Sequence, residues 1–167
     1  MRIFIGADHR GFSLKESLKK WLSENGIEHE DLGAYEFDPK DDYPIYAERV
    51  AEKISDALKN STDARGILIC GSGIGVDIVA NKFEGIRSGL GINIQQVTSA
   101  RRDDNINVLA IAADETESED AVTMLASFIE TEFVPSASHA RRLNEIEDIE
   151  KDKFEEGKGP YGVTGLE

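Results

Sequence analysis

The sequence predicts one α/β domain, in which a parallel sheet of about five strands lies between two layers of helices. Short apolar, β-branched runs alternate along the chain with longer segments of helical period. The 167 residues are enough for one substantial core, and 40% of them are hydrophobic. Repeated strand-then-helix units require a parallel sheet that is covered on both faces. We therefore expect residues 1–153 to form a three-layer α/β/α domain of the Rossmann-like kind.

Five segments are expected to form the strands of this sheet. The clearest has the sequence Gly-Ile-Leu-Ile-Cys and is bounded by turn residues, which is typical of a buried central strand. Substrates of such folds bind beyond the carboxyl ends of the strands, so the turns after Gly6, Cys70 and Ile92 are expected to meet around one site. The expected strands are Arg2–Gly6, His29–Leu32, Gly66–Cys70, Arg87–Ile92 and Asn107–Ala112.

Six segments have the apolar spacing of amphipathic helices. In the first of them Leu14, Leu18 and Leu22 recur near a helical period, while lysines and glutamates fill the gaps. Gly26 follows as a stop signal. The expected helices are Phe12–Asn25, Tyr43–Leu58, Val76–Phe83, Gln95–Asp104, Ser118–Glu132 and His139–Lys153.

Charge and cysteine content restrict the classes of function. The formal net charge of −14 argues against broad electrostatic binding to nucleic acid or to an anionic membrane. The single cysteine, Cys70, excludes an internal disulfide and fits a reducing compartment. No segment approaches the roughly 18 apolar residues of a membrane span, so we expect a cytoplasmic protein. Residues 154–167 are glycine-rich and are expected to form an extended tail, either mobile or docked on a partner subunit.

The glycine-rich turn Cys70–Gly75 lies where a buried strand is expected to pass into a helix. Glycines there let the backbone approach a ligand, and a helix N-terminus favours an anion and would lower the pKa of the Cys70 thiol. A dinucleotide-binding fingerprint fits poorly because Val76 replaces its last glycine, and a Walker phosphate loop lacks its lysine. Two interpretations stay open: a catalytic turn that stabilises an oxyanion beside a thiol, and a structural buried cysteine.

Several motifs together resemble those of one enzyme family. The run Gly66–Val76 is followed by Ala80-Asn81-Lys82-Phe83 and by Gly85-Ile86-Arg87, and it closely resembles the core signature of the ribose-5-phosphate isomerase B and galactose-6-phosphate isomerase family. Three further segments are similar to other motifs of that family, in the same order: Gly6–Lys15, Asp42–Ala47 and Asn105–Leu109. The resemblance extends from residue 1 to about residue 150.

The resemblance implies an aldose–ketose isomerase that moves a proton through a cis-enediolate and uses no metal and no cofactor. It gives Cys70 the role of the base beside the carbonyl, and Ser72 the role of a proton relay between two oxygens. The amides around Gly71, Gly73 and Gly75 would stabilise the enediolate oxygen, by about 3 kcal/mol for each good donor.

The resemblance also implies substrate contacts on two other loops. Asp8 and His9 match a pair that contacts the sugar or its phosphate, and Tyr43 matches a residue that lines the ring. For Asp8 alone the alternative is an N-cap of the following helix, and for His9 a histidine in a surface turn. Some members of the family carry a glutamate base where this chain has Val76, which leaves Cys70 as the candidate base.

Two positions in the fourth helix depart from the family pattern. The ring-opening histidine of the family falls on Asp103, and the asparagine after it falls on Asp104. A carboxylic acid can replace that histidine only if burial or a neighbouring charge raises its pKa toward neutrality. Asp103 is therefore a candidate catalytic group and Asp104 a candidate for substrate binding, with two solvated carboxylates as the alternative.

The phosphate-binding arginines of the family are largely replaced. One falls on Asp114 and another on Ser138, whereas Arg142 matches a third and has Arg141 beside it. Aspartate in place of arginine would repel a phosphate and would remove the bidentate fork. The sequence therefore disfavours ribose 5-phosphate as the substrate, and a different sugar phosphate held by Arg141 or Arg142, or a sugar without phosphate, fits these residues at least as well.

Three hypotheses of function follow from these residues. An active isomerase is favoured because Cys70, the glycine turn, Asp8 and Tyr43 are present. The alternative is a non-catalytic sugar-binding or regulatory subunit, since one histidine and two arginines of the family are absent. A nucleotide-binding domain is the third hypothesis. Family members are usually dimers with the site at the subunit interface, so we expect a homodimer or higher homo-oligomer in which Arg142 serves the neighbouring subunit.

Overall fold

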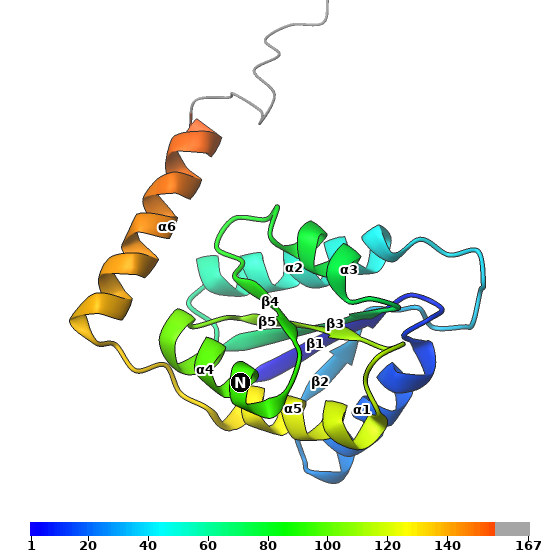
Figure 1. Cartoon of the computed structure of the whole chain (residues 1–167). Helices are drawn as coiled ribbons and strands as arrows, with labels where there is room; N and C mark the ends of the chain where they lie inside the picture. The colour runs from blue at the N-terminus through cyan, green and yellow to red at the C-terminus, as the bar shows by residue number, and fades with distance from the viewer. Residues whose placement is uncertain (156–167) are drawn as a thin grey trace, which may run out of the picture. The chain divides into compact units, whose positions relative to one another are not determined.

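A computed structural model describes the backbone of residues 1–155 and the side chains of residues 1–151 (Figure 1). The chain divides into two compact units, Met1–Phe133 and Val134–Glu167. The first unit holds five strands and five helices, and the described part of the second holds one helix. All predicted site residues except Arg141 and Arg142 belong to the first unit.

The five strands form one parallel sheet, as the sequence predicts. They are β1 (Arg2–Ala7), β2 (His29–Asp31), β3 (Ala64–Cys70), β4 (Ser88–Gly91) and β5 (Val108–Ala112). Every pairing is parallel, and the order across the sheet is β2-β1-β3-β5-β4. The strand that ends in Cys70 is therefore central, and β1 lies directly beside it.

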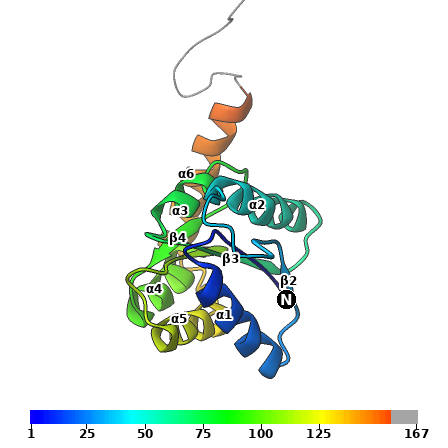
Figure 2. The same ribbon diagram turned by 90° about the vertical axis from the view of Figure 1, so that its right-hand side faces the viewer.

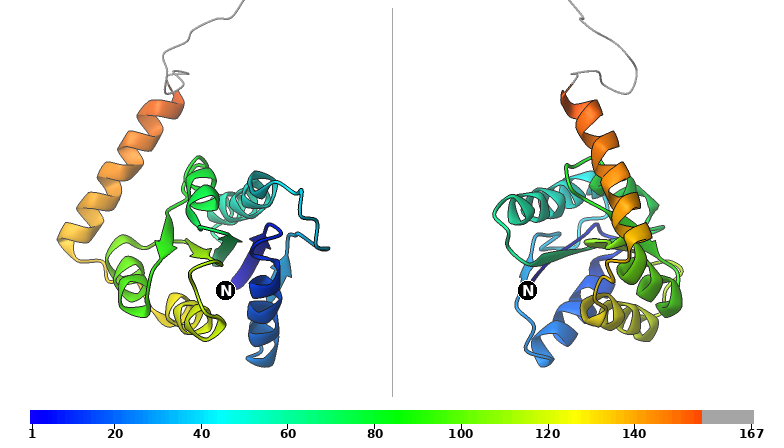
Figure 3. Two further views of the ribbon diagram at one scale, coloured as in Figure 1. Left: turned by 45° about the vertical axis from the view of Figure 1, so that its right-hand side comes forward. Right: turned by 90° about the vertical axis from the view of Figure 1, so that its left-hand side faces the viewer.

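Helices cover both faces of the sheet, which confirms the predicted three-layer architecture. The helices of the first unit are α1 (Phe12–Glu24), α2 (Tyr43–Lys59), α3 (Ile74–Ala80), α4 (Ile94–Asp104) and α5 (Ser118–Glu130). Figures 1 and 2 show α2 and α3 on one face and α1, α4 and α5 on the other, and both views in Figure 3 agree. Within the described residues, no helix combines the length and the apolar character of a membrane span.

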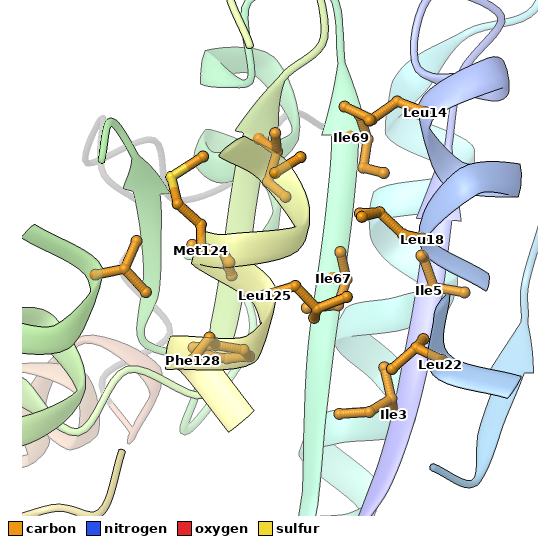
Figure 4. Packing of buried hydrophobic residues seen from close by; sticks show 14 of the residues in the cluster. Ile3, Ile5, Leu14, Leu18, Leu22, Ile67, Ile69, Met124, Leu125 and Phe128 are labelled. Carbon is orange, nitrogen blue, oxygen red and sulfur yellow. The ribbon is translucent and has the colours of Figure 1, made fainter. Parts of the chain in front are cut away.

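Side chains alternate along the strands and so contribute to two separate cores. Ile67 and Ile69 of β3 pack with apolar residues of α1 and α5, including Leu18 and Leu125 (Figure 4). Cys70 points to the other face, into a cluster formed with α2 and α3. Because successive strand residues face opposite sides of a sheet, the register of β3 determines that the thiol lies on the α2 and α3 side.

The second unit contains α6 (Ala137–Glu155), which corresponds to the last predicted helix. This helix belongs to the second compact unit, and its membership of the α/β domain stays a prediction. The predicted tail begins at residue 154, but α6 continues to Glu155, and residues 156–167 lie outside the described part of the chain.

Helix α3 starts two residues earlier than predicted, and this difference changes the length of the glycine turn. The helix begins at Ile74, earlier than the predicted Val76. Gly73 precedes it with φ of 71°, in the left-handed region that favours glycine, and this residue turns the chain from β3 into the helix. The glycine turn is therefore shorter and tighter than the sequence pattern predicts.

Lys15 is a fully buried lysine that links α1 to the end of β2. Its ammonium donates to both carboxylate oxygens of Asp31, at 2.8 and 2.7 Å, and to the Ala34 carbonyl at 2.6 Å. Burial raises the pKa of Asp31, but hydrogen bonds from Lys15 and Lys19 outweigh that effect and leave this pKa below its ordinary value. The cluster fixes the start of the long loop that leads to α2.

Replacing Lys15 with methionine should lower the free energy of unfolding by about 3 kcal/mol, because Asp31 would lose one of its two cations in a largely buried site. Denaturant unfolding at neutral pH measures the change. Lys20→Met is the matched control: Lys20 lies on the same helix with its side chain 76% exposed, and its replacement should change stability by less than about 0.5 kcal/mol. Equal losses in the two variants would contradict this account of Lys15.

Candidate active site

The first loop packs against the carboxyl end of β3 because β1 and β3 pair in parallel. Ala7 lies opposite Ile69 in the ladder, and the Asp8 amide donates to the Ile69 carbonyl at 3.3 Å. A Cβ atom at Gly11 would lie only 2.7 Å from that carbonyl oxygen, so only glycine allows this close approach. The loop from Asp8 to Gly11 is thus held beside the end of β3, where Cys70 lies.

Cys70 is the last residue of β3 and lies at the base of the glycine turn. It is only 4% exposed and belongs to the core cluster between the sheet and the two helices α2 and α3. Ser72, in the turn itself, is exposed. Cys70 is therefore almost entirely buried, whereas Ser72, two residues later, is open to solvent.

Tyr43 brings the start of α2 to the same end of the sheet. A Cβ atom at Gly75 would lie 2.7 Å from ring carbon Cζ of Tyr43, so the ring packs directly on the glycine turn. Tyr43 itself remains 39% exposed. The first loop, the glycine turn and the start of α2 therefore meet at one place, as the parallel topology predicts.

Asp8 stabilises the turn before α1 but does not have the alternative role of an N-cap, because the N-cap residue is Gly11 and no side chain caps the helix. Its Oδ1 accepts hydrogen bonds from the amides of Arg10 and Gly11, both at 3.0 Å, and so closes the turn before α1. Burial raises the pKa of the Asp8 carboxyl group, while these amide bonds and His9 act in the opposite direction. A role for Asp8 toward the substrate stays a prediction.

His9 is paired with Asp41, a residue that the sequence analysis missed. The distance from His9 Nδ1 to Asp41 Oδ1 is 2.6 Å, and the His9 amide donates to the same oxygen at 3.0 Å. The Asp41 side chain is 6% exposed and that of His9 is 27% exposed. A run of acidic residues before Tyr43 was the only available signal, and it does not distinguish Asp41 from its neighbours.

Arg10 and Asp114 form a second pair that joins distant parts of the chain. Arg10 Nε lies 3.3 Å from Asp114 Oδ1, and its Nη2 donates to Asp114 Oδ2. A Cβ atom at Gly71 would lie 2.5 Å from Arg10 Nε and 2.8 Å from Asp114 Oδ2, so the pair lies over the glycine turn. The sequence predicts that Asp114 repels a phosphate, whereas in the structure Asp114 has a cationic partner.

Asp103 and Asp104 lie at the opposite end of the sheet from Cys70. They end α4, and the chain then enters β5 near its amino end, where the Gly66 amide donates to the Asn107 carbonyl. Arg102 donates to both oxygens of Asp103, at 2.7 and 2.8 Å. Within one chain the structure does not bring these two carboxylates to the thiol, so their predicted roles would require a second subunit.

Arg141 and Arg142 belong to the second compact unit, on α6. Arg141 Nη1 donates to Glu145 Oε1 at 2.7 Å, one helical turn further along the same helix. The first unit alone therefore does not contain the two arginines that are predicted to hold the substrate.

The groups at the carboxyl end of the sheet are suited to acid–base chemistry. A paired imidazole can exchange protons, a thiol can act as a base, and a guanidinium with glycine amides can bind oxygen atoms. Within the described residues, no group of three or more His, Cys, Asp or Glu side chains is arranged to hold a metal ion.

Almost the whole chain matches proteins of one family. Residues 3–146 match the family model described as Ribose/Galactose Isomerase. The chain belongs to this family. A relative from Mycoplasma genitalium, described as a probable ribose-5-phosphate isomerase B, is 36% identical over 150 residues, which are 90% of this chain and 96% of the relative. The resemblance inferred from the motifs is therefore confirmed.

Solved structures of ribose/galactose isomerases have the same fold. The crystal structure of ribose-5-phosphate isomerase B from Mycoplasma genitalium with bound ribulose-5-phosphate has a TM-score of 0.85 and 36% identity, over 90% of this chain and 97% of that one. A ribose 5-phosphate isomerase from Thermotoga maritima has a TM-score of 0.81 and 37% identity, over 88% of this chain and 97% of that one. This family member is an enzyme, an isomerase of the aldose–ketose type.

Gly73→Ala should cost more stability than Gly26→Ala, although both glycines have left-handed backbones with φ of 71° and 67°. Each alanine pays about 1–2 kcal/mol for that conformation. At Gly73 the Cβ would also lie 2.5 Å from Leu90 Cδ1 and 3.0 Å from the Ala112 nitrogen, whereas at Gly26 it would meet nothing within 4 Å. We expect an additional loss of about 1–3 kcal/mol at Gly73 in thermal or denaturant unfolding; equal losses would show that the glycine turn is not tightly packed.

Proposed function

We propose that this isomerase moves a proton between C1 and C2 of a small sugar phosphate, with Cys70 as the base. The observation that carries the proposal is the position of Cys70, which ends the central strand β3 directly before the glycine turn and beside the loop of Asp8 and His9. Ribulose-5-phosphate bound to the Mycoplasma genitalium isomerase supports a ketose phosphate as the substrate or product of the reaction.

The proposed reaction begins with the open-chain aldose. The Cys70 thiolate takes the proton from C2, the C2–H electron pair forms the C1=C2 bond, and negative charge moves to O1. Amides of the glycine turn donate to this oxygen, each contributing about 3 kcal/mol when well aligned. The Ser72 hydroxyl passes the proton of O2 to O1, and Cys70 returns its proton to C1, which gives the ketose.

Other groups at this end of the sheet are less suited to be the base. Val76, where some family members carry a glutamate, is apolar and fully buried. Asp8 uses Oδ1 to hold two backbone amides of its own loop. Cys70 directly precedes the glycine turn in the chain. The backbone amides that would donate to a developing oxyanion are therefore its immediate neighbours.

The Arg10–Asp114 pair supports a phosphorylated substrate. The sequence analysis disfavours ribose 5-phosphate because Asp114 would repel its phosphate. Arg10 offsets that charge and places a guanidinium over Gly71, beside the proposed reaction centre. Since guanidinium groups bind phosphate well, and the relatives are named for ribose 5-phosphate, this sugar phosphate is the first substrate to test.

A non-catalytic sugar-binding subunit is the competing proposal. Two observations favour it: Cys70 is only 4% exposed, and Asp103 lies at the far end of the sheet with its carboxylate bound by Arg102. Under this proposal Cys70 is a packing residue of the α2 and α3 core, and the chain binds a sugar without turnover.

We also propose that the enzyme works as a homodimer or higher homo-oligomer in the cytoplasm. One fact supports a second subunit: Asp103 ends α4, at the opposite end of the sheet from the thiol of its own chain. A single cysteine without a disulfide partner fits a reducing compartment.

Cys70→Ser should reduce the exchange of the sugar C2 proton with solvent by about 10²-fold or more, because a hydroxyl is a far weaker base than a thiolate. Incorporation of deuterium from D2O into the sugar, followed by NMR, measures the exchange. Sugar binding should change little, since serine is close in size to cysteine, whereas the melting temperature should fall because a hydroxyl replaces a thiol in a buried apolar cluster. Undiminished exchange would remove Cys70 as the base, and sugar binding without exchange in the unmodified protein would favour the non-catalytic subunit.

Arg10→Gln should raise KM for ribose 5-phosphate about tenfold or more and change kcat little, because a charge-assisted bond to phosphate contributes roughly 1.5–3 kcal/mol. The inhibition constant for inorganic phosphate should rise in parallel. Arg2→Gln is the matched control: Arg2 begins β1 at the amino end of the sheet and pairs with Glu28 and Glu30. Unchanged kinetics for the Arg10 variant would contradict a phosphate site over Gly71.

A further inference from the structure

The His9–Asp41 pair has the geometry of an acid–base dyad. Asp41 Oδ1 accepts from both the amide and the ring Nδ1 of His9, at 3.0 and 2.6 Å, so backbone and imidazole are fixed by one oxygen. An ionised carboxylate can only accept hydrogen bonds, which places a proton on Nδ1 and leaves Nε2 as the basic nitrogen. Within the described residues, Nε2 has no hydrogen-bond partner, and the His9 side chain is 27% exposed.

The Asp41 carboxylate is almost completely buried, and its oxygen Oδ1 lies 2.6 Å from His9 Nδ1. Its side chain is 6% exposed, and its second oxygen, Oδ2, is buried without a hydrogen-bond partner of ordinary geometry in the described residues. Burial and then the Asp41 carboxylate raise the pKa of the Tyr46 phenol, which places Tyr46 next to the same group. The imidazole also makes a T-shaped contact with Phe37, with ring centroids 6.3 Å apart and an interplanar angle of 82°.

The proposed isomerisation needs a catalyst for one earlier step, the opening of the sugar ring. An aldopentose 5-phosphate exists mainly as a ring in which C1 is a hemiacetal, and the C2 proton becomes acidic only after the ring opens to an aldehyde. Ring opening requires one group that removes a proton from O1 and returns one to the ring oxygen. Asp103, the predicted candidate, ends α4 at the other end of the sheet, so it could act only from a second subunit, and both its carboxylate oxygens are bound by Arg102.

We propose that His9 catalyses ring opening of the sugar and that Asp41 is its positioning residue. This inference rests on the proposed function. His9 follows β1, the neighbour of the strand that ends in Cys70, so both groups lie at the carboxyl end of the sheet. Asp8, one residue earlier, is committed by Oδ1 to two backbone amides. His9 is thus the group at this edge that combines a held ring with an unbonded basic nitrogen.

The step balances with one imidazole. Neutral Nε2 takes the proton of the anomeric hydroxyl, and the electron pair of that O–H bond forms the C1=O double bond. The bond from C1 to the ring oxygen breaks, and the ring oxygen takes the proton back from Nε2. During the step the imidazole is transiently a cation, and the negative charge of Asp41, 2.6 Å from Nδ1, stabilises it.

The test compares a substrate that forms a ring with one that does not. Ribose 5-phosphate is cyclic, whereas ribulose 5-phosphate stays open because its terminal hydroxyl is esterified. For His9→Gln, conversion of ribose 5-phosphate should fall by about 10²-fold or more. Deuterium exchange from D2O into C1 of ribulose 5-phosphate should stay within about threefold of the unmodified enzyme. At high concentrations of the variant, the rate on ribose 5-phosphate should become independent of enzyme, because spontaneous ring opening then limits it.

Asp41→Asn should show the same selective loss in smaller degree, with kcat on ribose 5-phosphate reduced and KM little changed. His29→Asn is the matched control, because His29 begins β2 and its Nδ1 lies 3.0 Å from the Ile27 carbonyl oxygen; both activities should be unaffected. Equal losses on the two substrates, or a rise in KM alone, would overturn the ring-opening role of His9. If the unmodified enzyme neither converts ribose 5-phosphate nor exchanges ribulose 5-phosphate, the proposed function itself fails, and this inference falls with it.

Discussion

The parallel pairing of β1 with β3 is the constraint on which the site depends. It sets Ala7 opposite Ile69, so the two strands end together and the residues that follow them are neighbours. A shift of one residue would turn Cys70 toward the α1 and α5 core and would separate Asp8 from the Ile69 carbonyl. Gly11 tightens the arrangement further, because a side chain there would collide with Ile69.

Polar pairs then fix the loops that the sheet brings together. Lys15 anchors Asp31 and Ala34 at the start of the loop after β2, and Asp41 near its end holds His9. Charges in such sites are costly unless they are paired and hydrogen-bonded. The loop is therefore tied to the first helix at one end and to the first loop at the other, so the start of α2, with Tyr43, is positioned against the glycine turn.

Much of the fold is predictable from local patterns, and the polar pairs are not. The alternation of Ile67 and Ile69 with Leu68 and Cys70 follows from strand geometry and from burial on both faces. The His9–Asp41 and Arg10–Asp114 pairs join residues 32 and 104 positions apart, so no periodic pattern reveals them. Charge matching between loops depends on where the chain returns to the same end of the sheet.

Within the predicted site, too, some residues could be placed from local patterns and others could not. Cys70, the glycine turn, Asp8, His9 and Tyr43 follow strands or precede helices, and the parallel topology brings them together. Asp103 was proposed by correspondence with a family position, and only the tertiary structure shows that the end of α4 lies at the other end of the sheet. Alignment with a family motif predicts a role for Asp103, but the three-dimensional position of Asp103 determines whether it can act in the site of its own subunit.

A crystal structure with a bound hydroxamate analogue of the enediolate tests the central claim most directly. The account predicts that the analogue lies against the Cys70–Gly75 turn, with the atom that represents C2 about 3–3.5 Å from Cys70 Sγ. Its oxygen atoms should face the amides of the turn. An analogue bound elsewhere, or a Cys70 sulfur separated from it by packed side chains, would contradict the assignment of the thiol as the base.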